Sequence, residues 1–242
     1  MNMKEEYFVD HLQELRQRII KTLLIFIMCF LLSFLFVEDI YQWIIKDFDG
    51  QLAILGPTDI LWVFMVLAGV CALAGTIPVA AFQLWKFVSP ALTDEERKVT
   101  FRFIPFLFLL FIVGLSFGYF VLYPLVLKFL LSLSADYFAT MFTADKYFRF
   151  MLNLTLPFGF LFEMPLVVMF LTRLGILNPI RLARARKVSY FVLVILSILI
   201  TPPDIISDVL VIVPLLFLYE ISITLSKVVY RKKLKEEMSV GI

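Results

Sequence analysis

One carboxylate lies inside a run of apolar residues that is long enough to cross a lipid bilayer. Glu163 is the only charged residue between Phe150 and Thr172, in the segment FMLNLTLPFGFLFEMPLVVMFLT. A carboxylate at this depth costs roughly 2.5 to 3.5 kcal/mol to insert, and such residues usually face a protein interior, a water-filled cavity or a partner. Two interpretations remain open. Glu163 contacts a partner, or it forms a hydrogen bond within the helix bundle, for example with Gln83, that maintains helix packing.

Residues that bend helices surround this glutamate. Pro157, Gly159 and Pro165 lie in the same run. Prolines in a span kink the helix and free backbone carbonyl groups, which then need partners or water. We therefore expect a bent fourth spanning helix that forms one wall of a concave face.

Two segments outside the apolar runs also combine carboxylates with basic residues. In HLQELRQRI, from residue 11 to 19, the apolar side chains fall on one helical stripe and the charges fall off it, which predicts an amphipathic helix that enters the first span. An interfacial anchor explains such a helix without any binding role. In FVSPALTDEER, residues 87 to 97, Thr93 followed by Glu96 forms a capping-box pattern that opens the next helix.

The chain offers little for catalysis. A serine protease needs a buried serine with a base and a metalloprotease needs a cluster of ligands, but the sole histidine is His11 in the amino-terminal segment. No glycine-rich phosphate loop is present. We therefore expect no enzyme activity, no catalytic residues, no metal, no cofactor and no nucleic-acid partner.

The composition indicates which elements must hold these residues. Hydrophobic residues make up 62% of the chain and charged residues only 17%, against roughly 25% charged in soluble domains. We expect an integral membrane protein. The first apolar run is expected to be a retained span, because MNMKEEYFVDHLQELRQR before it is too long and too acidic for the start of a secretory signal.

Crossing the hydrocarbon core takes roughly 20 apolar residues. Four long runs meet this requirement, at 19–37, 60–84, 103–127 and 150–172. The last two runs, 188–201 and 209–219, cover only about 16 to 21 Å at about 1.5 Å per residue and are expected to form a short hairpin. The predicted fold class is all-α: a single membrane domain, 1–242, with six transmembrane helices, the last two short, and a concave face.

The basic residues indicate the orientation of these spans. Most of the 22 lysines and arginines fall in segments that six crossings place on one side, at 4–21, 86–102, 173–187 and 227–235. Loops rich in lysine and arginine stay in the cytoplasm, so both termini are predicted to be cytoplasmic. The cytoplasmic parts then include the amphipathic helix 1–18 and a basic tail, 228–242.

Four motifs occur in a fixed order across the six spans: HLQELRQR, FVSPALTDEER, FEMP and TPPD. With this order and sidedness, the chain resembles the TatC family, the core component of the twin-arginine protein translocase, over nearly its whole length. The resemblance implies Sec-independent export of folded proteins across the cytoplasmic (inner) membrane of a prokaryote, driven by the proton motive force. Its implied partners are twin-arginine signal peptides, the single-span proteins TatA and TatB, other TatC copies and the lipid bilayer.

The resemblance also assigns roles to the cytoplasmic carboxylates. Tat signal peptides carry two adjacent arginines, and a guanidinium is matched by a carboxylate through two charge-assisted hydrogen bonds. The matching positions here are Glu14 and Glu96, with Arg16 and Arg97 orienting them and Phe87 lining the groove. Without the resemblance, helix capping and surface solvation explain both glutamates.

The remaining assignments concern the spans and their outer ends. The resemblance places Glu163, with Gln83, where polar groups of TatA, TatB or the inserted signal are met. It makes the turn at Pro202, Pro203 and Asp204 a docking edge, and Pro57 an outer landmark. Asp204 can also cap the following helix.

The alternative function is a proton-coupled small-molecule transporter that uses Glu163 as its ionisable site. Such transporters usually show internal repeats and several polar residues near the middle of the membrane, and neither is evident in the sequence. A purely structural scaffold is the third interpretation.

Overall fold

The computed structural model describes residues 3–46, 52–134, 141–201 and 204–240. Within these ranges the side chains at 3–11, 91, 94–96, 134 and 235–240 are not described. The elements are helices, and the chain divides into two compact units, Met1–Phe108 and Leu109–Ile242.

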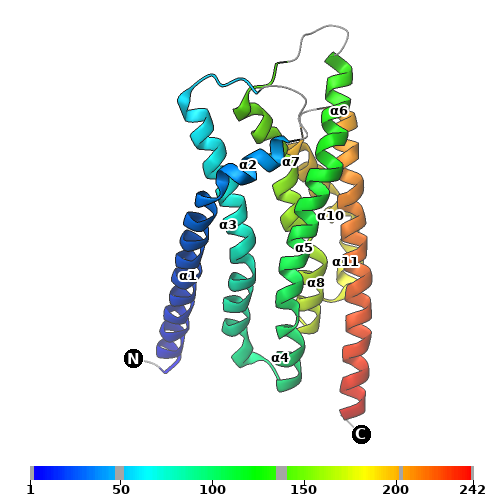
Figure 1. Ribbon diagram of the computed structural model, residues 1–242. Helices are drawn as coiled ribbons and strands as arrows, with labels where there is room; N and C mark the ends of the chain where they lie inside the picture. Colours follow the sequence, from blue (N-terminus) through cyan, green and yellow to red (C-terminus); the bar gives the residue numbers. More distant parts are fainter. Residues whose placement is uncertain (1–2, 47–51, 135–140, 202–203, 241–242) are drawn as a thin grey trace. The chain divides into compact units, whose positions relative to one another are not determined.

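The first unit is built on two long helices that lie side by side. These are α1 (Met3–Leu35) and α3 (Pro57–Val88), with α2 (Val37–Ile45) between them in the sequence (Figure 1). A single 3-10 turn, η1 (Ser89–Ala91), and helix α4 (Asp94–Phe101) follow α3. Because α1 contains neither glycine nor proline, the predicted amphipathic segment and the first span form one continuous helix.

The second unit continues the helix that follows α4. Its elements are α5 (Phe103–Phe117), which begins in the first unit, the π-helical segment η2 (Gly118–Leu122), α6 (Tyr123–Ser134), α7 (Ala144–Leu161), α8 (Met164–Arg173), α9 (Pro179–Arg184), α10 (Arg186–Ile200) and α11 (Ile205–Val240). Buried aromatic and aliphatic side chains fill the space between them, among them Phe111, Phe148 and Phe158.

Helices α5 and α7 approach each other through glycines. A Cβ atom on Gly114 would lie 2.4 Å from the backbone oxygen of Phe158, and a Cβ atom on Gly159 would lie 2.7 Å from the ring of Phe111. Small residues let helix backbones pack closely in a membrane, where the hydrophobic effect does not drive helices together. This packing therefore requires glycine at both positions.

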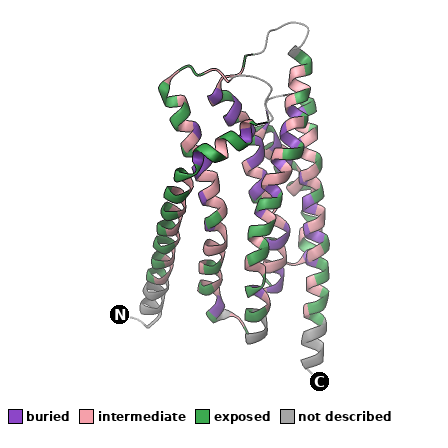
Figure 2. Ribbon diagram, in the orientation of Figure 1, coloured by how far each residue is buried: buried purple, intermediate pink, exposed green. Residues whose placement is uncertain are grey.

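Five helical stretches within the described residues are long and apolar enough to cross a membrane. They are Leu12–Leu35, Pro57–Val88, Arg97–Leu133, Ala144–Arg173 and Ile205–Leu234. Figure 2 shows that most of the described part of α1 is exposed, and Leu23, Leu24 and Leu31 are all more than half exposed. Such an apolar surface suits contact with lipid. The four long runs predicted from the sequence fall within or overlap the first four stretches, and the chain is a multi-pass membrane protein.

The last two helices differ in length. Helix α10 has 15 residues and is short, as predicted. Helix α11 has 36 residues, so the prediction of a short last helix is wrong. The apolar run predicted from the sequence ends at Tyr219 because the next residue, Glu220, carries a charge.

Glu220 lies inside α11, since glutamate is a good helix former, and α10 supplies partners for its charge. Arg186 donates two hydrogen bonds to the carboxylate, from Nε to Oε1 at 2.8 Å and from Nη2 to Oε2 at 2.9 Å. The hydroxyl of Tyr190 donates a third, to Oε1 at 2.6 Å. The hydrogen bond to Glu220 and its negative charge raise the pKa of Arg186, so the guanidinium stays protonated. The carboxylate thus joins α11 to α10.

The glycine contact predicts a difference between two alanine variants. Gly114→Ala should lower the temperature of thermal unfolding of the purified protein, because its methyl group meets the backbone of Phe158 and overpacking costs about 1 to 3 kcal/mol. Gly69→Ala is the control, since a Cβ atom there lies 4.0 Å from the ring of Phe30. Circular dichroism of both variants in detergent measures the difference. Equal unfolding temperatures would show that the close approach of α5 and α7 does not matter for stability.

The pairing of Glu220 predicts a local loosening of α10. Glu220→Gln should speed hydrogen exchange of the α10 amides, measured by mass spectrometry, because the amide side chain cannot hold the guanidinium at two oxygens. Arg184→Gln removes an exposed charge on α9 and should leave α10 unchanged. Adding Arg186→Gln to Glu220→Gln should cause little further increase in the hydrogen-exchange rate of the α10 amides. Fully additive effects of the two substitutions would contradict the pairing.

Candidate functional site

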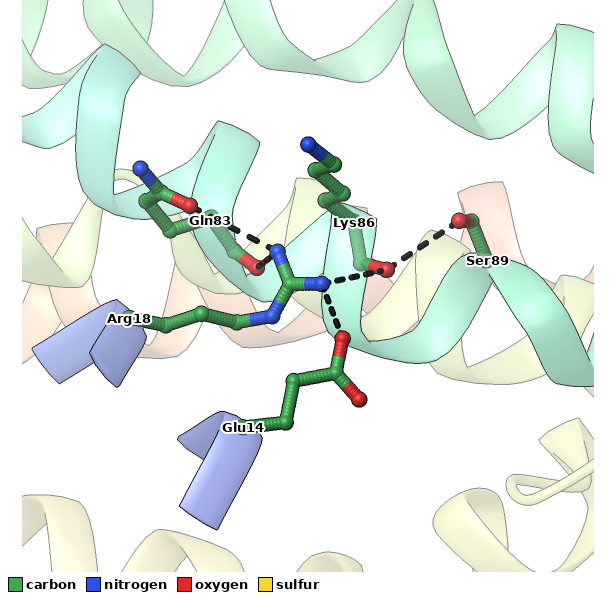
Figure 3. Close-up of polar contacts among 5 residues, drawn as sticks. All are labelled: Glu14, Arg18, Gln83, Lys86 and Ser89. Carbon is green, nitrogen blue, oxygen red and sulfur yellow. Dashed lines mark hydrogen bonds and ion pairs between the residues drawn. The ribbon is translucent and has the colours of Figure 1, made fainter. Parts of the chain in front are cut away.

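A guanidinium lies among acceptors that come from α1 and α3. Arg18 donates from Nη2 to Glu14 Oε1, one helical turn earlier on α1. It also reaches the carboxyl-terminal part of α3, as Figure 3 shows. The distances are 3.4 Å from Nη2 to the backbone oxygen of Lys86, and 3.5 Å from Nη1 to both the backbone oxygen and Oε1 of Gln83. We call these four oxygen atoms of Glu14, Gln83 and Lys86 the acceptor cluster.

The position of the acceptor cluster follows from how α3 ends. Helix α3 stops at Val88, so its last carbonyl groups lack partners within the helix, and the negative end of the helix dipole lies there. A cation is therefore stabilised at this end. The side chain of Arg18 is only 13% exposed, whereas that of Glu14 is 39% exposed. The site thus binds a guanidinium and is open to solvent or lipid headgroups on the side of Glu14.

Arg18, not Arg16, contacts Glu14. The prediction that Arg16 orients this glutamate is therefore wrong. Residues four apart in a helix share a face, whereas residues two apart point to nearly opposite sides. Arg16 is exposed and forms no ion pair with any residue in the described part of the chain.

Trp85 joins α4 to the end of α3. The guanidinium carbon of Arg97 lies 5.8 Å from the centre of the Trp85 ring, within the range of a cation–π interaction. The indole Nε1 donates to Thr100 Oγ1 at 3.0 Å, and the ring packs edge-on against Phe101 with centroids 5.1 Å apart. Arg97 was predicted to orient Glu96, and the contact that the structure gives it is with Trp85.

The remaining two predicted residues of this site lie on either side of the turn between α3 and α4. Phe87 is half-buried in the last turn of α3. Glu96 belongs to α4, which begins directly after Thr93, and its side chain is among those not described. Glu14, Arg97 and the backbone of Glu96 all belong to the first unit.

The fourth spanning helix is interrupted at Glu163. Helix α7 ends at Leu161 and α8 begins at Met164. Pro165 has no N–H group, so the carbonyl of Leu161 loses its usual helical hydrogen bond. The N–H of Glu163 donates to the oxygen of Phe160 at 3.1 Å, which tightens the chain into a turn. This interruption lies where the sequence predicts a bend.

The carboxyl group of Glu163 has an unusual environment. The residue is half-buried, and its Oε1 atom is buried without a hydrogen-bond partner among the residues described. Its neighbour Phe162 packs against Phe117 and Phe158, with ring centroids 5.4 and 6.4 Å apart. More than about 90% of buried polar atoms have a partner, so this one requires an explanation.

Gln83 has a different partner from the one suggested by the sequence. Its Oε1 atom accepts a hydrogen bond from Arg18 in the first unit, whereas Glu163 belongs to the second unit. Gln83 is therefore part of the acceptor cluster.

The outer residues mark helix ends. Pro57 is the first residue of α3, a position where a backbone N–H is not needed. Asp204 Oδ1 accepts a hydrogen bond from the backbone N–H of Ser207 at 2.7 Å and so caps α11. Pro202 and Pro203 lie outside the described residues.

The contacts of four side chains, those of Arg18, Trp85, Arg186 and Glu220, were not predicted from the sequence. Arg18 was recognisable from its spacing, since it follows Glu14 by one helical turn. Trp85 and the pair of Arg186 with Glu220 have no local signal, because each contact joins two helices.

The chain is similar to known proteins over nearly its whole length. The family model for "Sec-independent protein translocase protein (TatC)" matches residues 10–214. The chain is 66% identical to the Sec-independent protein translocase protein TatCd of Bacillus subtilis (strain 168) over 241 residues, which is 100% of both chains. It is 43% identical to TatCy of the same organism, over 97% of this chain and 94% of that protein.

Solved structures agree with these relatives. A crystal structure of a twin-arginine translocase receptor, TatC, superimposes with a TM-score of 0.79 at 33% identity, and covers 90% of this chain and 99% of that one. A second, in the detergent DDM, gives a TM-score of 0.80 at 34% identity, over 89% of this chain and 99% of that one.

Proposed function

Because the chain belongs to the TatC family of Sec-independent protein translocases, we propose that it is the receptor subunit that recognises the paired arginines of twin-arginine signal peptides through Glu14 and Glu96. The observation that carries this proposal is the acceptor cluster, which already holds one guanidinium, that of Arg18. A site that accommodates an arginine side chain of its own chain has the charge and the spacing to bind one from a peptide.

Glu96 supplies the second carboxylate in this proposal. The contacts of Trp85 with Arg97 and Thr100 hold α4 against the end of α3, the same helix end that carries part of the acceptor cluster. Two adjacent arginines of a peptide then meet one carboxylate from α1 and one from α4. Phe87, in the last turn of α3, lines the groove between them.

The proposed topology has six crossings in the cytoplasmic (inner) membrane of a prokaryote, with α10 as the short crossing and both termini in the cytoplasm. One contact in the second unit supports it. Lys233 Nζ, near the end of α11, donates to the backbone oxygen of Arg173, the last residue of α8, at 2.9 Å. Two of the basic segments therefore meet on the same side, as the excess of positive charge in cytoplasmic loops requires.

Glu163 is proposed to contact a polar group of TatA, of TatB or of the inserted signal peptide. Its buried Oε1 atom without a partner among the described residues supports this role. The turn at Pro202, Pro203 and Asp204 is the proposed docking edge for partner helices and other TatC copies, and Pro57 shapes the outer cap. Export of folded proteins is driven by the proton motive force. Since the relatives are protein translocases, the interpretation as a small-molecule transporter is dropped.

Removing either proposed carboxylate should weaken peptide binding. Glu14→Gln and Glu96→Gln should each raise the dissociation constant of a labelled twin-arginine peptide by about tenfold, because a hydrogen bond to a charged group contributes roughly 1.5 to 3 kcal/mol. Fluorescence anisotropy with the protein in nanodiscs measures the constant. Glu38→Gln, which removes an exposed carboxylate on α2, is the control. Binding that is unchanged in both variants would rule out this site.

Export in cells tests the role of Glu163. The wild-type chain, produced with its own single-span partners, should restore export of a twin-arginine precursor in cells that lack TatC. Glu163→Ala should reduce export severalfold, whereas Asn153→Ala, at an exposed position of α7, should not. Export is measured as the fraction of precursor processed outside the cytoplasm, with the amount of TatC determined in parallel. Normal export by Glu163→Ala would leave this glutamate a structural role only.

A further inference from the structure

We propose that Arg18 is a built-in competitor of the signal peptide: its guanidinium fills the acceptor cluster when no peptide is bound, and a signal-peptide arginine replaces it there. This inference rests on the function proposed above and adds a control of affinity within the receptor.

Arg18 occupies the acceptor cluster when no peptide is bound. The acceptor cluster offers four oxygen atoms, and Arg18 contacts all four of them (Figure 3). Its side chain is only 13% exposed. A peptide guanidinium of the same size cannot occupy this volume while Arg18 is there.

Arg18 fits the acceptor cluster imperfectly. Its contacts with Gln83 are 3.5 Å long and the contact with Lys86 is 3.4 Å, whereas strong N–H···O hydrogen bonds measure about 2.7 to 3.2 Å. The Nε atom is buried and has no partner among the described residues. Arg18 reaches these acceptors from the backbone of α1, which restricts the directions from which its guanidinium can approach α3. A peptide arginine is free of this restraint.

The presence of Arg18 in the acceptor cluster lowers the apparent affinity of the receptor for a signal peptide. Any ligand of the cluster binds only the fraction of receptors in which Arg18 has left, and its apparent affinity falls in proportion to that fraction. The factor is the same for every peptide that uses the cluster. A lysine peptide, whose ammonium group cannot make the forked hydrogen bonds of a guanidinium, then falls below useful affinity first. Arg18 would thus set the threshold that a signal peptide must exceed.

A second role for Arg18 makes the opposite prediction. If Arg18 only positions the carboxylate of Glu14 for the peptide, its removal weakens binding. The direction of the change in affinity therefore decides between competition and positioning.

The experiment compares two arginines two residues apart. Arg18→Gln and Arg16→Gln remove the same charge from α1, but Arg16 is exposed and lies outside the cluster. Labelled twin-arginine and twin-lysine peptides are titrated into wild-type protein and both variants in nanodiscs. We expect Arg18→Gln to bind the arginine peptide on the order of tenfold more tightly, with a similar gain for the lysine peptide, and Arg16→Gln to differ from wild type by less than about twofold.

Two further variants complete the test. Arg18→Lys keeps the charge but fills the cluster less well, so a smaller gain in peptide affinity is expected. This variant replaces Arg18→Gln in the test if Arg18→Gln does not fold. In a Glu14→Gln background, Arg18→Gln should bring little gain, because the negative charge that holds the resident guanidinium is already lost.

The outcomes separate this inference from the function it rests on. Binding by Arg18→Gln and Arg18→Lys that is weaker than wild type, or equal to Arg16→Gln, overturns the competitor role. Wild-type protein that binds arginine and lysine peptides equally well, with no effect of Glu14→Gln, overturns the proposed recognition site itself.

Discussion

One constraint shapes the structure: a charge beside apolar helices needs a partner, supplied either by the protein itself or by another molecule. Arg186 and Tyr190 donate hydrogen bonds to Glu220, which lies inside the 36 residues of α11 at the position where the predicted apolar run ends. The same constraint acts at the other end of the chain, where Glu14 and the last carbonyls of α3 surround Arg18. In both places a guanidinium joins two helices. Because such contacts are charge-assisted and directional, they help to fix which faces of the helices meet, as the close glycine contacts do between α5 and α7.

The sequence predicts the long helices well because the thickness of the membrane fixes the length of an apolar run. It also predicts the break at Glu163, since Pro165 removes a helical hydrogen bond regardless of the rest of the fold. The length of α11 was not predictable in this way. A rule that ends a span at a charged residue treats Glu220 as unpaired, and its partner Arg186 is 34 residues away. Local periodicity does not show which two helices touch.

The contacts of the candidate site could likewise be predicted from the sequence only in part. Arg16 and Arg18 are equivalent by composition and by sidedness, and only the helical register decides which of them meets Glu14. That register was available from the spacing, because a residue four positions later lies on the same face. The contribution of Gln83 and Lys86 was not available, because a backbone carbonyl at a helix end leaves no mark in the sequence. Trp85 likewise acquires its role only when α4 folds back toward the end of α3.

The acceptor cluster and Glu163 differ in whether a basic side chain of the protein is already bound there. An empty cluster of acceptors at the end of a helix attracts any cation, and a guanidinium of the receptor's own that already lies there lowers the apparent affinity for every ligand by the same factor. The apolar run 150–172 contains no basic residue that can do the same for Glu163. Its buried oxygen, without a partner in the described chain, instead lies at a break between α7 and α8, where the backbone has already left the regular helix. A partner that supplies a polar group to this oxygen has no resident basic group to displace, which suits a contact formed only during assembly.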